Sequence, residues 1–64
     1  MKGIAKRDIR LIIGEEQDYI YTFTKGVGYP CIFRNHDAVR ILDNNEEEAI
    51  VSCEYFNENF ELRV

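Results

Sequence analysis

The stretch DAVRILDNNEEEAIVSC, residues 37–53, sets the fold of this chain, because two β-type runs in it flank a polar turn. In the run AVRIL, Arg40 separates Val39 from Ile41, and in AIVSCEY the polar Ser52 and Glu54 alternate with Val51 and Cys53, as side chains do in strands with one buried face. Asn44 and Asn45 tolerate the left-handed backbone that tight turns require. The stretch therefore predicts a β-hairpin whose turn is followed by three glutamates.

Other short β-type runs, separated by turn residues, occupy the rest of the chain. The first of them also fits a helix, because Ile9, Ile12 and Ile13 could line one face, but its β-branched end favours a strand. Together they predict an all-β domain, a small SH3-like, partly open barrel of five to six short antiparallel strands. The predicted strands are 4–13, 19–24, 29–33, 38–42, 49–55 and 60–64, with one 3₁₀ turn at 56–59.

The pattern resembles the small SH3-like β-barrels encoded by Firmicutes and their phages. A Thr-x-Gly-x-x-Tyr step leads into a strand, and a hairpin follows that ends in Asp-Asn-Asn. The residues that carry the resemblance are Thr24, Gly26, Tyr29, Val39, Ile41, Asp43, Asn44 and Asn45. The resemblance implies a fold and an origin in a mobile element, but no activity. The chain has no Trp, which argues against the aromatic groove of proline-binding SH3 domains.

Sixty-four residues predict a single domain over 1–64, with too small a core to enclose a substrate cavity. We therefore expect a protein that is not an enzyme. No apolar run approaches the roughly 20 residues of a membrane helix. The first ten residues carry charges throughout and do not resemble a signal peptide, so we expect a cytoplasmic protein.

Few residues suit catalysis or metal binding. His36 is the only histidine, and Cys31 is the thiol nearest to it in the sequence. We interpret His36 as an exposed turn residue, and Cys31 and Cys53 as buried free thiols, because strand cysteines are usually inert. Two cysteines and one histidine do not match the spacing of a zinc site. We predict no catalytic residue, no metal site and no cofactor.

The start of the chain is basic, and residues 1–8 are a candidate flexible basic arm. Such an arm could contact phosphates through counterion release, which would make the protein a small nucleic-acid-binding barrel. The alternative is a solubilising tail. The candidate nucleic-acid contacts are Lys2, Lys6, Arg7 and Arg10.

The last third of the chain is acidic, with seven carboxylates from Asp43 to Glu61 and no Lys or Arg between them. These carboxylates could serve only to solvate the barrel. They could also form a negative surface that is steered to a basic partner. Exposed tyrosines would then be anchors. The candidate partner-binding residues are Asp43, Glu46, Glu47, Glu48, Glu54, Glu58 and Tyr55.

These features lead to a hypothesis of a non-enzymatic protein-interaction module. It would be a phage or mobile-element accessory protein that binds a host or defence protein with a basic surface and modulates or inhibits it. Nucleic-acid binding through the basic arm is one alternative. Self-association through an unprotected strand edge, near Pro30 or in the first strand, is another, and the oligomeric state stays open.

Overall fold

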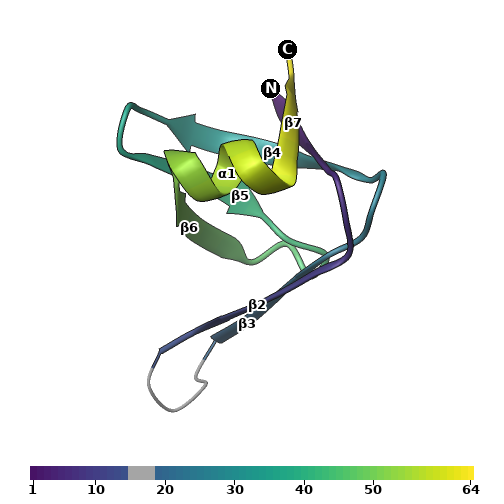
Figure 1. The fold of residues 1–64 in the computed structure, drawn as a ribbon. Helices are drawn as coiled ribbons and strands as arrows, with labels where there is room; N and C mark the ends of the chain where they lie inside the picture. Colours follow the sequence, from purple (N-terminus) through teal and green to yellow (C-terminus); the bar gives the residue numbers. More distant parts are fainter. Residues whose placement is uncertain (15–18) are drawn as a thin grey trace.

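The computed structural model describes residues 1–14 and 19–64, which form seven β-strands and one short helix (Figure 1). In chain order the elements are β1 (Lys2–Ala5), β2 (Ile9–Ile13), β3 (Tyr19–Phe23), β4 (Gly28–Arg34), β5 (Ala38–Leu42), β6 (Glu48–Ser52), α1 (Cys53–Asn59) and β7 (Phe60–Arg63). Five strands make an antiparallel sheet in the order β6-β5-β4-β1-β7, and β2 pairs with β3 in a separate hairpin. The predicted all-β, partly open barrel is confirmed.

Strand β1 corrects the prediction of a flexible arm over residues 1–8. It lies between β4 and β7, and Gly3 is paired with Tyr29 on one side and with Leu62 on the other. A Cβ added at Gly3 would lie 2.8 Å from the ring of Phe56, so the close approach of β1 to the helix requires glycine here. The strand predicted over 4–13 is therefore divided into β1 and β2, which raises the number of strands.

Helix α1 replaces the predicted single 3₁₀ turn at 56–59 and the end of the strand predicted over 49–55. Ser52 is its N-cap, and the Ser52 hydroxyl accepts a hydrogen bond from the N–H of Tyr55 at 3.0 Å. Glu54 lies in the first turn, where its charge suits the helix dipole. Because Phe56 is buried and packs into the core, tertiary contacts support a helix of only seven residues.

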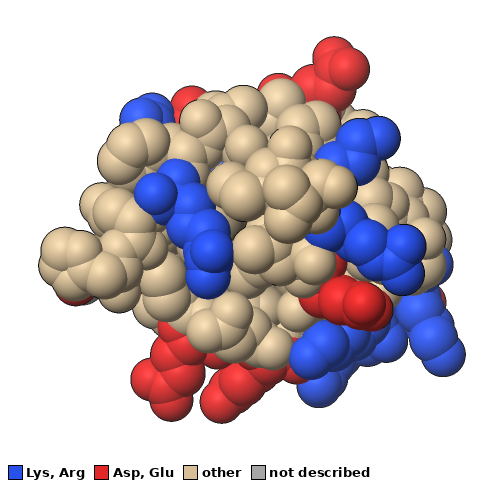
Figure 2. Space-filling view, turned by 90° about the horizontal axis from the view of Figure 1, so that it is seen from above, with Lys and Arg blue, Asp and Glu red and all other residues tan. Residues whose placement is uncertain are grey.

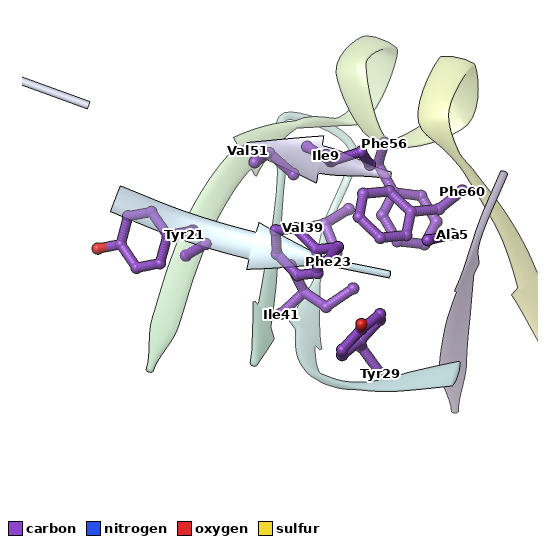
Figure 3. Packing of buried hydrophobic residues seen from close by; sticks show 11 residues of the cluster. Ala5, Ile9, Tyr21, Phe23, Tyr29, Val39, Ile41, Val51, Phe56 and Phe60 are labelled. Carbon is purple, nitrogen blue, oxygen red and sulfur yellow. The ribbon is translucent and has the colours of Figure 1, made fainter. Parts of the chain in front are cut away.

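The core lies between the curled sheet, the helix and the base of the β2–β3 hairpin (Figure 3). Three phenylalanines form its centre. The ring of Phe60 stacks on Phe56 at 5.2 Å between centroids and meets Phe23 edge-on at 5.1 Å. Such offset and edge-to-face pairs contribute beyond the area that they bury. Val39 and Ile41 of β5 are fully buried beneath them.

Tyr29 ties the loop before β4 to the β5–β6 turn. Its hydroxyl accepts a hydrogen bond from the N–H of Thr24 at 2.5 Å and donates one to Oδ1 of Asn44 at 2.6 Å. Gly26, at a φ of 83°, supplies the left-handed residue of the intervening turn. The Thr-x-Gly-x-x-Tyr step is therefore a structural element that fixes this loop.

Candidate interaction surface

The β5–β6 turn is closed by the carboxylate of Asp43, which is only 3% exposed. Its Oδ1 accepts hydrogen bonds from the N–H groups of Asn45 and Glu47, both at 2.9 Å. Its Oδ2 accepts from the N–H of Thr22, on β3, at 3.1 Å. Asp43, which the sequence suggested as a partner-binding residue, therefore holds the turn and offers almost no surface to a partner.

The other carboxylates of this hairpin differ in their surroundings. Glu46 and Glu47 are exposed on the turn and form no ion pair with any residue that the structure describes. Glu48 is half-buried, and its Oε1 accepts from the guanidinium of Arg40 on the neighbouring strand. The free negative charge of the hairpin thus belongs to Glu46 and Glu47, which we call the turn acids.

The acidic residues of α1 form a separate group. Glu54 and Glu58 are exposed and lie four residues apart, so they share one face of the helix. Tyr55 is half-buried; burial raises its pKa, and the nearby positive charge of Arg7 acts in the opposite direction. Because the whole of β6, about 16 Å long, lies between Glu47 and α1, the seven acids do not form one continuous row.

The cations of the predicted basic arm are dispersed. Lys6 Nζ donates to the carbonyl of Asn57 at 3.1 Å, so this side chain lies against the end of α1. Arg10 is on β2, opposite Thr22. On the face shown in Figure 2, basic side chains lie at several separate places with acidic ones beside them. The four residues, on β1, the following bend and β2, are Lys2, Lys6, Arg7 and Arg10.

On the outer face of β4, β5 and β6, exposed apolar side chains of β4 and β6 lie on either side of Arg40 of β5. Arg40 of β5 is paired with Phe33 on one side and with Ile50 on the other, which makes a row across the three strands. The register shifts between Cys31 and Phe33, and in such a bulge two residues oppose one, so Ile32 joins the row. Ile32, Phe33 and Ile50 are 50%, 49% and 58% exposed, and we call them the outer patch.

The sequence contains a signal for the outer patch that strand alternation alone did not reveal. CIF and AIV, residues 31–33 and 49–51, each place three apolar residues in succession. On a strand, successive side chains point to opposite faces, so such a run must put an apolar side chain outside. The middle residues of both runs, Ile32 and Ile50, are exposed.

Among residues 1–14 and 19–64, no hydrogen bond joins His36 to either cysteine, and the Cys53 thiol donates instead to the carbonyl of Asn35 at 2.9 Å. His36 is exposed and lies 3.2 Å from Asp37, and it borders an open pocket of about 370 Å³ that neither cysteine lines. Both cysteines are free and half-buried, and Cys53 begins α1 instead of lying in a strand. Within residues 1–14 and 19–64, no three His, Cys, Asp or Glu side chains are placed to hold a metal ion.

Comparisons with protein-family models, with curated proteins and with solved structures find no match to this chain. Among the described residues, α1 is the only helix, and it is far too short to cross a bilayer. A function for this protein therefore has to be inferred from the chemistry of its own surface.

Proposed function

We propose that this protein is a non-enzymatic interaction module that binds a partner protein through the outer patch and the turn acids. The outer patch carries the proposal, because Ile32 and Phe33 of β4 and Ile50 of β6 are each about half exposed and lie on either side of Arg40 of β5. Half-exposed apolar side chains beside charged ones are typical of a binding site.

The border of the outer patch indicates a partner with a basic surface. Glu46 and Glu47 lie at the turn end of β6, and Glu48, the next residue, forms an ion pair with Arg40, which lies between Phe33 and Ile50. Apolar contacts at the centre would supply most of the affinity, and the carboxylates would speed association and fix the orientation. The turn is a rigid platform for them, because Asp43 holds it with three hydrogen bonds.

The biological role that we propose is that of a phage or mobile-element accessory protein which modulates or inhibits a host or defence protein. This step depends on the resemblance to small SH3-like barrels of Firmicutes and their phages. A small acidic module of this kind would act by occupying a basic surface that its target needs for another ligand.

Affinity capture from cells that produce the protein, followed by binding measurements with purified partner, tests the proposal. The informative variants are Phe33→Ser in the outer patch and the double change Glu46→Lys with Glu47→Lys in the turn. We expect the first to weaken binding by about a hundredfold, as for an apolar anchor. We expect the second to slow association mainly, by about tenfold at low salt.

A matched control is Tyr19→Ser, because Tyr19 is 58% exposed but lies on the hairpin away from the outer patch. It should leave binding unchanged. The proposal fails if the partner binds Phe33→Ser as tightly as the unchanged protein, or if Tyr19→Ser alone abolishes binding.

A further inference from the structure

Strand β6 is an edge of the five-stranded sheet, and no other described strand pairs with its free side. The pairing with β5 fixes which backbone groups point outward. The N–H of Asp43 donates to the carbonyl of Glu47, and the N–H of Cys53 donates to that of Asp37. Since bonded and non-bonded pairs alternate in an antiparallel ladder, Ala49 and Val51 bond to β5. The N–H and C=O groups of Glu48 and Ile50 therefore face away from the sheet.

The free edge is short and carries Glu48, but it lacks the other devices that proteins use to block strand addition. β6 contains no Pro and no Lys, and Ile50, at its middle, is 58% exposed. Within the described β4–β5–β6 part of the sheet, the only irregularity of register lies in β4, two strands away. An added strand would meet straight, regularly paired backbone.

The charges around this edge discriminate between possible occupants. Glu46 and Glu47 lie at one end of β6 and Glu54 lies just beyond the other. A second copy pairing antiparallel would bring the turn acids of each chain to the Glu54 end of the other. A parallel copy would place Glu48 beside Glu48. Like charges that close repel, so a second copy is disfavoured in both directions.

We propose that the β6 edge accepts an extended segment of the partner as a sixth strand, one with β-branched residues at its centre and Lys or Arg at both ends. Glu48 and Ile50 supply the backbone hydrogen bonds, and the central side chain on the same face packs beside Ile50. The terminal cations meet the turn acids and Glu54. The inference rests on the proposed function and specifies the part of the partner that the protein recognises.

The test is titration of the isotope-labelled full chain with a capped peptide of sequence Lys-Lys-Thr-Val-Thr-Val-Thr-Lys-Lys, followed by NMR and amide hydrogen exchange. We expect exchange at the amides of Glu48 and Ile50 to slow by about tenfold, because strand addition gives these N–H groups acceptors. The same peptide with Glu in place of every Lys should leave both amides unchanged.

Two variants of Ile50 distinguish the contribution of its backbone N–H to peptide binding from that of its side chain. Ile50→Pro removes the outward N–H while leaving the bonds to β5 in place, and proline is tolerated at such edge positions. It should abolish peptide binding, whereas Ile50→Val should keep it. If Ile50→Pro does not fold, exchange in the unchanged protein still decides the matter.

The inference is overturned if the acidic peptide protects the edge equally, or if the basic peptide perturbs other residues only. It is also overturned if both amides become protected in the free protein as its concentration rises, because a second copy would then occupy the edge. These outcomes leave the proposed function intact as long as Phe33→Ser still weakens capture of the partner. Loss of that effect would instead remove the proposed function.

Discussion

The β2–β3 and β5–β6 hairpins are matched in length, each with five paired positions per strand, but they differ in what they bury. The inward side chains of β5 and β6 are at most 7% exposed along the whole hairpin. Along one face of β3, exposure rises from 2% at Phe23 to 9% at Tyr21 and 58% at Tyr19. One hairpin is therefore buried throughout on its inner face, and the other only at its base.

The difference comes from neighbouring elements and not from strand pattern. β5 lies inside the main sheet, and α1 covers the inner face of this region. Among the described strands, β2 and β3 pair only with each other, and Figure 1 shows their far end extending from the rest of the molecule. An isolated two-stranded ribbon is marginally stable, so the far end of this hairpin depends on cross-strand pairs such as Ile13 with Tyr19. Alternating apolar and polar residues give a strand one apolar face. Whether that face is buried depends on whether another element packs against it.

The sharpest test of this comparison uses two aromatic residues on one face of one strand. Phe23→Ala should lower the free energy of unfolding by about 4 kcal/mol, because it removes a ring packed against Tyr29 and Phe60. Tyr19→Ala should lower it by less than about 0.5 kcal/mol. Urea denaturation followed by circular dichroism measures both. Equal losses for the two variants would mean that the far end of the hairpin is covered after all.

A second test concerns the hydrogen bonds by which Asp43 connects the β5–β6 turn to β3. Asp43→Ala should cost about 3 kcal/mol, because three N–H groups, including that of Thr22 on β3, lose a charged acceptor. Thermal or urea unfolding gives the value.

Two further variants control for charge and for shape. Glu47→Gln removes a neighbouring carboxylate without touching these bonds and should change stability by less than about 0.5 kcal/mol. Asp43→Asn keeps the shape and one oxygen acceptor, so it should fall between. A cost for Asp43→Ala no larger than that of Glu47→Gln would contradict the structural role of Asp43.

Asp43 was predicted to bind a partner, but it is buried and holds the turn, and the reason for the difference lies in a contact between residues far apart in the sequence. The pattern predicted a turn at Asn44 and Asn45 and a strand over 19–24, because both depend on neighbouring residues only. It could not show that Asp43 reaches Thr22, which is 21 positions away. A run of acids looks the same whether one of them is buried under backbone N–H groups or all face solvent.

The two misassigned segments have the same physical origin. The sequence 49–55 has strand-forming residues, but the Ser52 side chain caps a helix and Phe56 finds a place in the core, so β6 ends early. Residues 2–5 look like a charged tail until β4 and β7 are known to flank them. Of the candidate interaction surface, the acidic residues of the turn were predicted from the sequence. The outer patch was not, because apolar runs show that some side chain is exposed, whereas its place beside others depends on strand pairing and on the bulge in β4.

A smaller effect is expected at Glu46, which adopts a φ of 62°, in the left-handed region that side chains disfavour. Glu46→Gly should raise the free energy of unfolding by about 1 kcal/mol, since glycine takes this conformation without steric cost. Equilibrium unfolding measures the gain. Glu46→Ala is the control: it removes the same charge but keeps the Cβ, and should give no gain. A stabilised Glu46→Ala would mean that charge repulsion, and not backbone conformation, limits this turn.

The smallest expected effect is a change in the pKa of Tyr21, which reports how close the β5–β6 turn lies to β3. Burial, and after it the negative charge of Glu47, raises the pKa of the Tyr21 hydroxyl above its ordinary value of 10.0. Above about pH 10 the unfolded chain releases this proton first, so the contribution of Tyr21 to stability is complete below that pH and is lost as pH rises through the folded pKa. Ultraviolet titration of tyrosinate, with Tyr21→Phe to isolate the signal, should show that Glu47→Gln brings the pKa of Tyr21 partway back, because burial remains. No change in Glu47→Gln would mean that the Glu47 carboxylate does not lie close to the Tyr21 hydroxyl.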